Sequence, residues 1–263
     1  GTLGSTVSMS GGTLDVDETL TLSGALTQGG NITIDVAEDK TLTYSGAALS
    51  LGANTLTLSG EGRLSNSNAL VLNNASSKLL LSSSITVDNV RTSLANSGLD
   101  VDNNSTVSSL TVAHTTPVSI ADGKSLSGAI TVTAGSIRLD EAGELASTIA
   151  MSGGTLDADN SLTLSGTLTQ SGNIEIDVAD NKTLTYSGAA LSLDNNTLTL
   201  SGEGRLSNSN ALVLNNASSK LLLSNSITVD SVRTSLASLG LDVDANSTVS
   251  SLTFGHTTPV SIV

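Results

Sequence analysis

The stretch from Met9 to Gly24, MSGGTLDVDETLTLSG, contains the two features of the sequence that decide its fold. It returns with few changes from Met151 to Gly166, as MSGGTLDADNSLTLSG, 142 residues later. Its polar and apolar residues also alternate, most clearly in the TLTLSG run that begins at Thr19. Alternation of this kind, bounded by Ser, Asp and Gly, is typical of half-buried β-strands. The sequence therefore predicts a repeated, all-β protein.

A shorter period lies inside the long one. Pairs with the pattern aliphatic–any–aliphatic recur before the cycle restarts at Leu156: Leu14 and Val16, Ile34 and Val36, Leu49 and Leu51, Leu70 and Leu72, Leu99 and Val101, Val118 and Ile120, and Ile137 and Leu139. We take each pair as the same strand of successive coils, most of them about 20 residues long. Short strands separated by frequent turns, in coils of this length, predict a parallel β-solenoid of about 13 coils.

The 142-residue repeat covers nearly the whole chain. Residues 1–120 match residues 143–262 without a gap, with about 21 differences. Most differences exchange polar residues, which is expected if the fixed aliphatic residues face a core. We therefore divide the chain into a first solenoid repeat, residues 1–142, and a second, truncated repeat, residues 143–263, within one continuous solenoid. Val263 stands where Ala121 would begin the next segment, so the chain looks like an excerpt from a longer array.

Composition excludes several classes of protein. The chain has no Cys, which excludes disulfide scaffolds, zinc ribbons and thiol catalysis. Its net charge of -14 argues against nucleic acid and anionic membrane surfaces as partners. No apolar run approaches the roughly 18 residues of a membrane span, so we expect no membrane insertion.

Three runs carry a resemblance to a known group of proteins: GANTLTLSG at Gly52–Gly60, SLTLSG at Ser161–Gly166 and NTLTLSG at Asn196–Gly202. They resemble the strand runs of bacterial surface β-helices, the autotransporter passengers and filamentous-haemagglutinin-like adhesins. The resemblance implies a right-handed parallel β-helix, secretion to the bacterial cell surface, and a stalk or adhesin role. Expected partners are other copies stacked end to end, or a host or cell-surface receptor.

Pairs of aspartates around a single valine are the candidates for a metal site. Asp100 and Asp102, and their repeats Asp242 and Asp244, would place two carboxylates outward around an inward Val. Calcium prefers such oxygen ligands. The spacing fits neither an EF-hand loop nor the calcium-binding β-roll repeat, so solvated acids at coil corners are the preferred interpretation. Calcium is the one cofactor that the sequence suggests, and catalytic residues are not predicted.

Outward threonines suggest a second kind of ligand-binding solenoid. Three pairs could stack into a short threonine ladder like those of ice-binding solenoids: Thr19 and Thr21, Thr41 and Thr43, and Thr55 and Thr57. Lys78 and Leu80 would follow in the next coil and end the ladder. Threonine is also a common strand residue, so a structural role is the preferred interpretation.

A polysaccharide-cleaving β-helix is the enzymatic alternative. Such an enzyme needs paired carboxylates and usually has aromatic residues that bind sugars. The aromatic residues of this chain, Tyr44, Tyr186 and Phe254, replace aliphatic residues at inward positions, so we expect them in the core. The sequence therefore does not predict an enzyme.

The two histidines, His114 and His256, occupy equivalent positions in HTTP runs. Seven coils of about 4.8 Å would separate them by roughly 34 Å, too far to share a metal or a proton. We expect both to be corner residues that precede the strands after each Pro.

Two further expectations concern local contacts. Glu61 with Arg63, and Glu203 with Arg205, are expected to be surface ion pairs worth under about 1 kcal/mol. The only segment that could form a helical turn is Arg91–Ser97.

Overall fold

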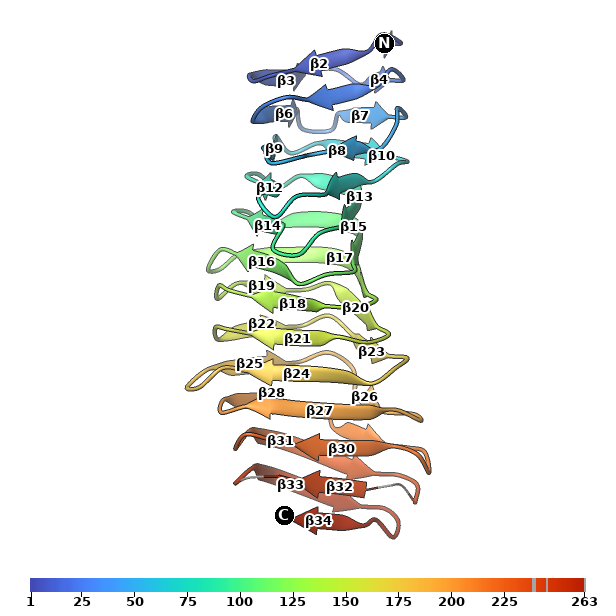
Figure 1. Cartoon of the computed structure of the whole chain (residues 1–263), viewed down its shortest axis with the longest axis vertical. Helices are drawn as coiled ribbons and strands as arrows, with labels where there is room; N and C mark the ends of the chain where they lie inside the picture. Colours follow the sequence, from blue (N-terminus) through green and yellow to red (C-terminus); the bar gives the residue numbers. More distant parts are fainter. Residues whose placement is uncertain (238–239, 245, 263) are drawn as a thin grey trace.

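The computed structural model describes residues 1–237, 240–244 and 246–262. In this part of the chain there are 34 β-strands and no helix. The strands wind into coils that stack along one long axis, with the N-terminus at one end and the C-terminus at the other (Figure 1). The all-β parallel solenoid predicted from the sequence is therefore confirmed.

The first side of the solenoid is a sheet of thirteen parallel strands, one from each coil, paired in chain order. This agrees with the predicted number of about 13 coils. The strands are β3 (Thr13–Val16), β6 (Ile32–Val36), β9 (Thr55–Ser59), β12 (Lys78–Leu81), β14 (Gly98–Val101), β16 (Thr116–Ile120), β18 (Ser136–Leu139), β21 (Thr155–Ala158), β24 (Ile174–Val178), β27 (Thr197–Gly202), β30 (Lys220–Leu223), β32 (Gly240–Val243) and β34 (Val260–Ile262).

The other two sides are formed by a 19-stranded sheet and a two-stranded sheet. The large sheet contains β1 (Thr2–Leu3), β4 (Leu20–Leu22), β7 (Thr41–Tyr44), β8 (Leu49–Ser50), β10 (Arg63–Asn66), β11 (Leu70–Leu72), β13 (Thr86–Thr92), β15 (Ser105–Val112), β17 (Ser125–Val132), β19 (Glu144–Leu145), β20 (Thr148–Met151), β22 (Leu162–Leu164), β23 (Leu168–Gln170), β25 (Thr183–Tyr186), β26 (Leu191–Ser192), β28 (Arg205–Asn208), β29 (Leu212–Leu214), β31 (Thr228–Thr234) and β33 (Thr248–Phe254). The small sheet contains β2 (Val7–Met9) and β5 (Leu26–Gln28).

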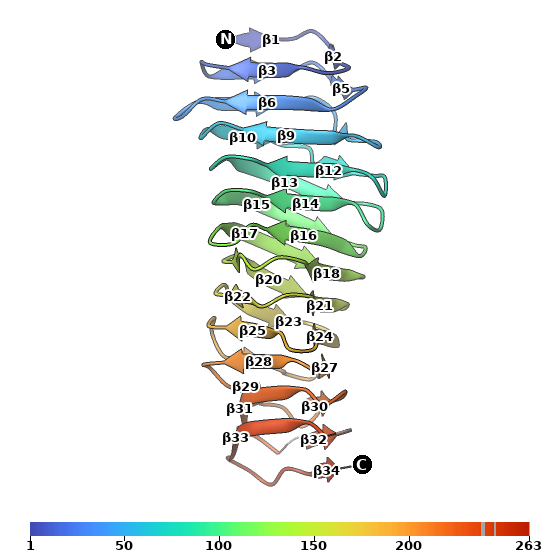
Figure 2. The same cartoon turned by 90° about the vertical axis from the view of Figure 1, so that its left-hand side faces the viewer.

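Each coil is three-sided. After β3 on the first side, β4 pairs with β7 of the next coil on the second side, and β5 pairs with β2 on the third. Further along the chain, long strands such as β15 cover the second and third sides together. The register of β15 with β17 shifts between Val107 and Leu110, where the long strand turns the corner. Figure 2 shows these sides as continuous stacks along the axis.

Inward side chains stack in columns because the strands are in register. One column on the first side is aliphatic through eight coils and fully buried: Ile32, Leu56, Leu79, Leu99, Val118, Leu139, Ala158 and Val178. Each member lies between a residue of the coil above and one of the coil below. A single coil would leave both of its faces open to water, so burial requires the stack.

One part of the predicted short period is wrong. Leu49 and Leu70 lie in β8 and β11 of the 19-stranded sheet, not on the side that holds Leu14 and Ile34. In those coils the equivalent pairs are Leu56 with Leu58 and Leu79 with Leu81. Register relates Ile34 to Leu58, a step of 24 residues, so coil length is more even than the predicted pairs suggested.

Asparagine side chains satisfy backbone groups between coils. Asn66 is buried: its Nδ2 donates to the carbonyls of Asn68 (3.0 Å) and Asn89 (2.7 Å), and its Oδ1 accepts the N–H groups of Asp88 (3.2 Å) and Asn89 (3.3 Å). Asn208 makes the equivalent bonds in the second repeat. The bonds to Asp88 and Asn89 reach the next coil and fix the spacing of the coils, whereas the bond to Asn68 fixes the local turn.

Gly202 illustrates how closely the coils approach at a corner. Its φ is +85°, and a Cβ there would lie 2.0 Å from the carbonyl oxygen of Val178 in the preceding coil. Both the left-handed backbone and the lack of space require glycine. Gly60 repeats this arrangement in the first repeat, against Val36.

The segment after Arg91 is not helical. β13 continues to Thr92, and turns follow before β14 begins at Gly98. Among the described residues, no helix with the length and apolar character of a membrane span occurs.

Candidate functional site

The aspartates proposed for calcium lie beside lysines. Asp100, on the outer face of β14, forms an ion pair with Lys78 of the preceding coil. Asp242 forms the same pair with Lys220, with 2.6 Å between Nζ and Oδ2. Asp102 and Asp244 follow their strands and do not share these pairs in the part of the chain that the structure describes. Within that part, no group of three or more His, Cys, Asp or Glu side chains has metal-site geometry. Calcium binding by these four aspartates stays a prediction.

The threonine ladder, which the sequence analysis gave as the less favoured alternative, does not form. Thr21 and Thr43 are aligned in the 19-stranded sheet, and the next member of that row is Ser65. Thr55 and Thr57 lie instead on β9 of the 13-stranded sheet, so they belong to another side of the solenoid. Lys78 and Leu80 do follow them in the next coil, as expected.

Two of the three aromatic residues are core residues, as predicted. Tyr44 and Tyr186 are buried, and the Tyr44 hydroxyl donates to the Ala47 carbonyl (2.6 Å) and accepts the Leu26 N–H (3.1 Å). Phe254 is 53% exposed, although register places it at the inward position of the buried Val112. It lies in a coil that has a neighbour on one side only (Figure 1).

His114 and His256 are exposed corner residues that precede Pro117 and Pro259, as predicted. Pro117 lies within β16, and Pro259 directly precedes β34. The Thr116 hydroxyl donates to the His114 carbonyl (3.0 Å). The contact that holds this corner is therefore made by the backbone of His114 and not by its imidazole ring.

The arginines that were predicted to pair with Glu61 and Glu203 pair instead with aspartates of the next coil. Arg63 contacts Asp88, with 2.6 Å between Nη2 and Oδ1, and Arg205 contacts Asp230 at 2.7 Å. The predicted Glu61 and Glu203 pairs are replaced by these contacts. The same aspartates also accept hydrogen bonds from serines of the arginine's strand: Ser65 donates to Asp88, and Ser207 donates to Asp230. In both repeats the two strands are paired in parallel. The ion-pair partner of each arginine is therefore set by the stacking of the coils and not by closeness along the sequence.

A group of carboxylates that the sequence analysis missed lies on the outer face of β21 and β24. Asp157 is in register with Asp177, and Glu175 with Thr155. Together with Ser136 they line a shallow hollow of about 220 Å³. The Ser201 hydroxyl is 2.5 Å from Glu175 Oε1 and 2.6 Å from Asp177 Oδ2.

Charge crowding alters the acidity of this group. Burial, together with the nearby charges of Asp159 and Asp177, raises the pKa of Asp157 from 3.8 to about 6, against the opposing effect of Arg138. Glu175 replaces Thr33 of the first repeat, so the second repeat carries the extra carboxylate. That substitution was the one signal in the sequence, but its meaning depends on the register of the strands.

We expect the Asp157 carboxyl to make stability depend on pH. Because its pKa is higher in the folded chain, the folded state binds the proton more tightly, and this contribution to stability is present below about pH 4 and lost as pH rises through about 6. Asp157→Asn should therefore raise the free energy of unfolding at pH 7.5, by about 1 kcal/mol or less because solvent screens a half-exposed group. Urea unfolding at pH 7.5 and pH 4 measures the difference.

Asp15→Asn, at the equivalent place in the first repeat, is the matched control. It should leave the dependence of the free energy of unfolding on pH as it is in the wild type. An equal gain from Asp157→Asn at both pH values would contradict the assignment.

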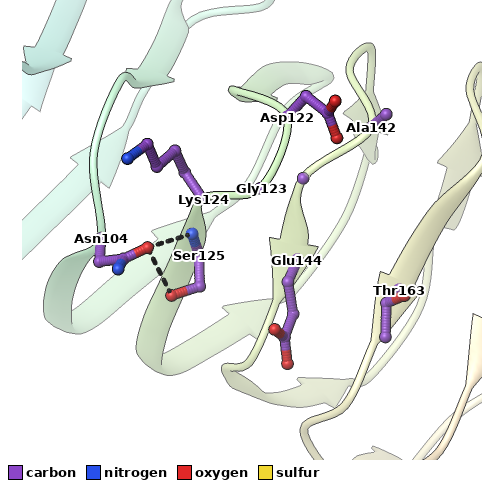
Figure 3. Close-up of a pocket in the computed structure, with 9 residues that line it drawn as sticks. Asn104, Asp122, Gly123, Lys124, Ser125, Ala142, Glu144 and Thr163 are labelled. Carbon is purple, nitrogen blue, oxygen red and sulfur yellow. Dashed lines mark hydrogen bonds between the residues drawn. The ribbon is translucent and has the colours of Figure 1, made fainter.

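A second hollow, of about 390 Å³, lies where the two repeats join (Figure 3). Two residues of its lining are joined, because Asn104 Oδ1 accepts the N–H (3.0 Å) and the hydroxyl (3.3 Å) of Ser125. Lys124 and Glu144 also line it, and Figure 3 shows their side chains extending in different directions. Glu144 accepts a hydrogen bond from the Ser165 hydroxyl. Among the polar side chains of the hollow, those of Asn104, Ser125 and Glu144 are therefore engaged in contacts between coils.

Comparison with known proteins adds no relatives. No protein-family model matches the chain, no curated protein matches it, and no solved structure matches it. Its architecture defines its class: a parallel β-solenoid with an internal repeat of 142 residues.

Proposed function

We propose that this chain is a stiff structural segment of an extracellular bacterial surface protein, serving as a stalk or as part of an adhesin. The observation that carries the proposal is the unbroken stack of thirteen strands through both repeats. Thirteen coils at about 4.8 Å give a rod roughly 60 Å long. Each inner coil is hydrogen-bonded and packed against both neighbours, so bending the rod would break contacts along a whole side.

Two properties of the sequence support this role. The net charge of -14 would keep neighbouring rods apart by repulsion. The absence of cysteine avoids crosslinking in oxidising surroundings. The strand runs that resemble bacterial surface β-helices favour the same location and role. End-to-end stacking of copies of this polypeptide is the partner interaction that we propose, because a parallel coil presents a row of backbone donors and acceptors to the next coil.

Small-angle X-ray scattering tests the proposal. We expect a maximum dimension of roughly 60 Å or slightly more for the monomer, with the constant cross-section of a rod, and longer particles of the same cross-section at high protein concentration. A compact particle would overturn the proposal. A calcium-dependent rise in the thermal midpoint, thermal hysteresis on freezing, or release of sugars from a polysaccharide would instead favour a ligand-binding or enzymatic role.

A further inference from the structure

Three β-turns of the solenoid close in the same way, and they span residues 37–40, 121–124 and 179–182. In each turn the N–H of the final lysine donates to the carbonyl of the first alanine, at 3.0, 2.9 and 3.0 Å respectively. The third residue of each turn has a positive φ: +58° at Asp39, +69° at Gly123 and +58° at Asn181. The middle turn alone places glycine there, after Asp122, and this is the only Asp-Gly pair in the sequence.

The carboxylate and the following N–H of the middle turn are exposed and uncommitted. Asp122 and Gly123 are both exposed, and a Cβ at Gly123 would meet no atom within 4 Å. In the part of the chain that the structure describes, the Gly123 N–H donates no backbone hydrogen bond and the Asp122 carboxylate forms no ion pair. Figure 3 shows the Asp122 side chain without a hydrogen bond to the other residues drawn. In the equivalent turn of the second repeat, by contrast, Asn181 Nδ2 donates to Asp180 Oδ2 (2.9 Å).

We propose that Asp122 is a site of spontaneous covalent modification, at which the peptide link to Gly123 is converted to an isoaspartyl link. The Gly123 nitrogen attacks Cγ of the protonated Asp122 carboxyl, a C–N bond forms, the nitrogen loses its proton and water leaves, which closes a five-membered succinimide ring. Water then adds to the ring carbonyl that came from the Asp122 backbone, and the bond from that carbon to the Gly123 nitrogen breaks. The water that is released is taken up again, and no other reactant is needed. Glycine favours the ring because it has no Cβ to hinder the attack and its backbone rotates freely.

The isoaspartyl link lengthens a turn whose two ends are held. The main chain then runs through Cβ and Cγ of Asp122, which adds one carbon to its path. The Ala121 N–H donates to the Val101 carbonyl (3.0 Å) of the preceding coil, and the Glu144 N–H of the following coil donates to the Lys124 carbonyl (2.8 Å). The folded chain must give up contacts at this corner to fit the extra carbon, whereas the unfolded chain gives up none. The modification therefore loosens the solenoid where its two repeats join.

A second aspartate separates the effect of the turn from that of a small neighbouring residue. Asp230 precedes Ser231, and both lie within β31. The Ser231 N–H donates to Asn208 Oδ1 (3.2 Å), and the Asp230 carboxylate is 2.7 Å from the Arg205 guanidinium. Because both reacting groups are committed in the folded chain, we expect Asp230 to react only after unfolding.

Incubation of the intact chain at 37 °C in neutral buffer, followed by peptide mass spectrometry, tests the site. Isoaspartate has the mass of aspartate, and electron-transfer fragmentation at its Cα–Cβ bond identifies it. We expect isoaspartate at Asp122 in the folded chain, at a rate within several-fold of the rate in guanidinium chloride, and at Asp230 in guanidinium chloride alone. Its absence from Asp122 in the folded chain would overturn the proposal, and so would equal accumulation at the two aspartates without denaturant.

Two substitutions taken from the other turns are the matched controls. Gly123→Asn copies the Asp180–Asn181 pair, whose Asn has the same positive φ, so it should keep the fold and slow the reaction several-fold. Asp122→Glu copies Glu38 and should abolish the reaction at this position, because its carboxyl would have to close a six-membered ring.

The loss of stability is measured on aged samples. Aged wild type should unfold at a lower denaturant concentration than fresh wild type, whereas aged and fresh Asp122→Glu should unfold alike. Equal rates of modification with and without Gly123→Asn would refute the role of glycine, and equal midpoints for aged and fresh wild type would refute the loosening of the corner. Neither readout depends on the dimensions of the rod, so failure here is distinguishable from failure of the proposed function.

Discussion

Leu79→Asn is expected to destabilise the protein by at least about 3 kcal/mol, because it removes a buried aliphatic group and buries an amide without partners. Leu79 is fully buried in β12, between Leu56 and Leu99 of the adjacent coils. The amide would face the same column of aliphatic side chains above and below. Chemical unfolding followed by circular dichroism measures the loss.

Leu80→Asn is the matched control, on the same strand and with the same chemistry. Leu80 faces outward, in register with Thr57 and Asp100. Its replacement should cost about 1 kcal/mol or less. Similar losses for the two variants would contradict the inward and outward assignment on which the fold depends.

Asn66→Ala is expected to cost about 2–4 kcal/mol, because four backbone groups around this buried side chain lose their hydrogen-bond partner at once. Three of the four bonds of the Asn66 side chain join its turn to the following coil, and the fourth closes the turn itself at Asn68. Asn208→Ala removes the equivalent bonds from the second repeat and should cost a similar amount. Unfolding midpoints in urea, with the slope checked for two-state behaviour, give both values.

Ser67→Ala controls for the substitution itself, since Ser67 is exposed beside Asn66. It should change the free energy of unfolding by less than about 0.5 kcal/mol. A loss from Asn66→Ala no larger than this would show that the asparagine does not hold the coils together.

Much of the fold follows from the sequence because its signals are local. Alternation marks strands wherever they occur, as in Thr19–Gly24, and the 142-residue repeat requires equal structures in both halves. Tyr44 could be placed in the core because it stands where an aliphatic residue is expected. The number of coils follows from the length of the chain divided by a coil length of about 20 residues.

The wrong predictions share one physical cause, which is that alternation looks the same on every side of a coil. Leu49 was expected on the side formed by the 13-stranded sheet but lies in the 19-stranded sheet. Thr55 was expected beside Thr41 but lies in the 13-stranded sheet. Only the register between coils decides the side. Register also chooses Asp88 as the partner of Arg63 and brings Asp157 beside Asp177, so neither contact could be derived from spacing along the chain.

The most direct test of the stacked solenoid is a distance between equivalent residues of the two repeats. Ser67→Cys and Ser209→Cys place spin labels at two exposed positions in a chain with no other cysteine. Seven coils of the 13-stranded sheet separate the two positions. At about 4.8 Å per coil, double electron–electron resonance should give a narrow distribution of distances between the labels, centred near about 34 Å. A broad distribution, or a separation well away from this value, would contradict a single continuous stack.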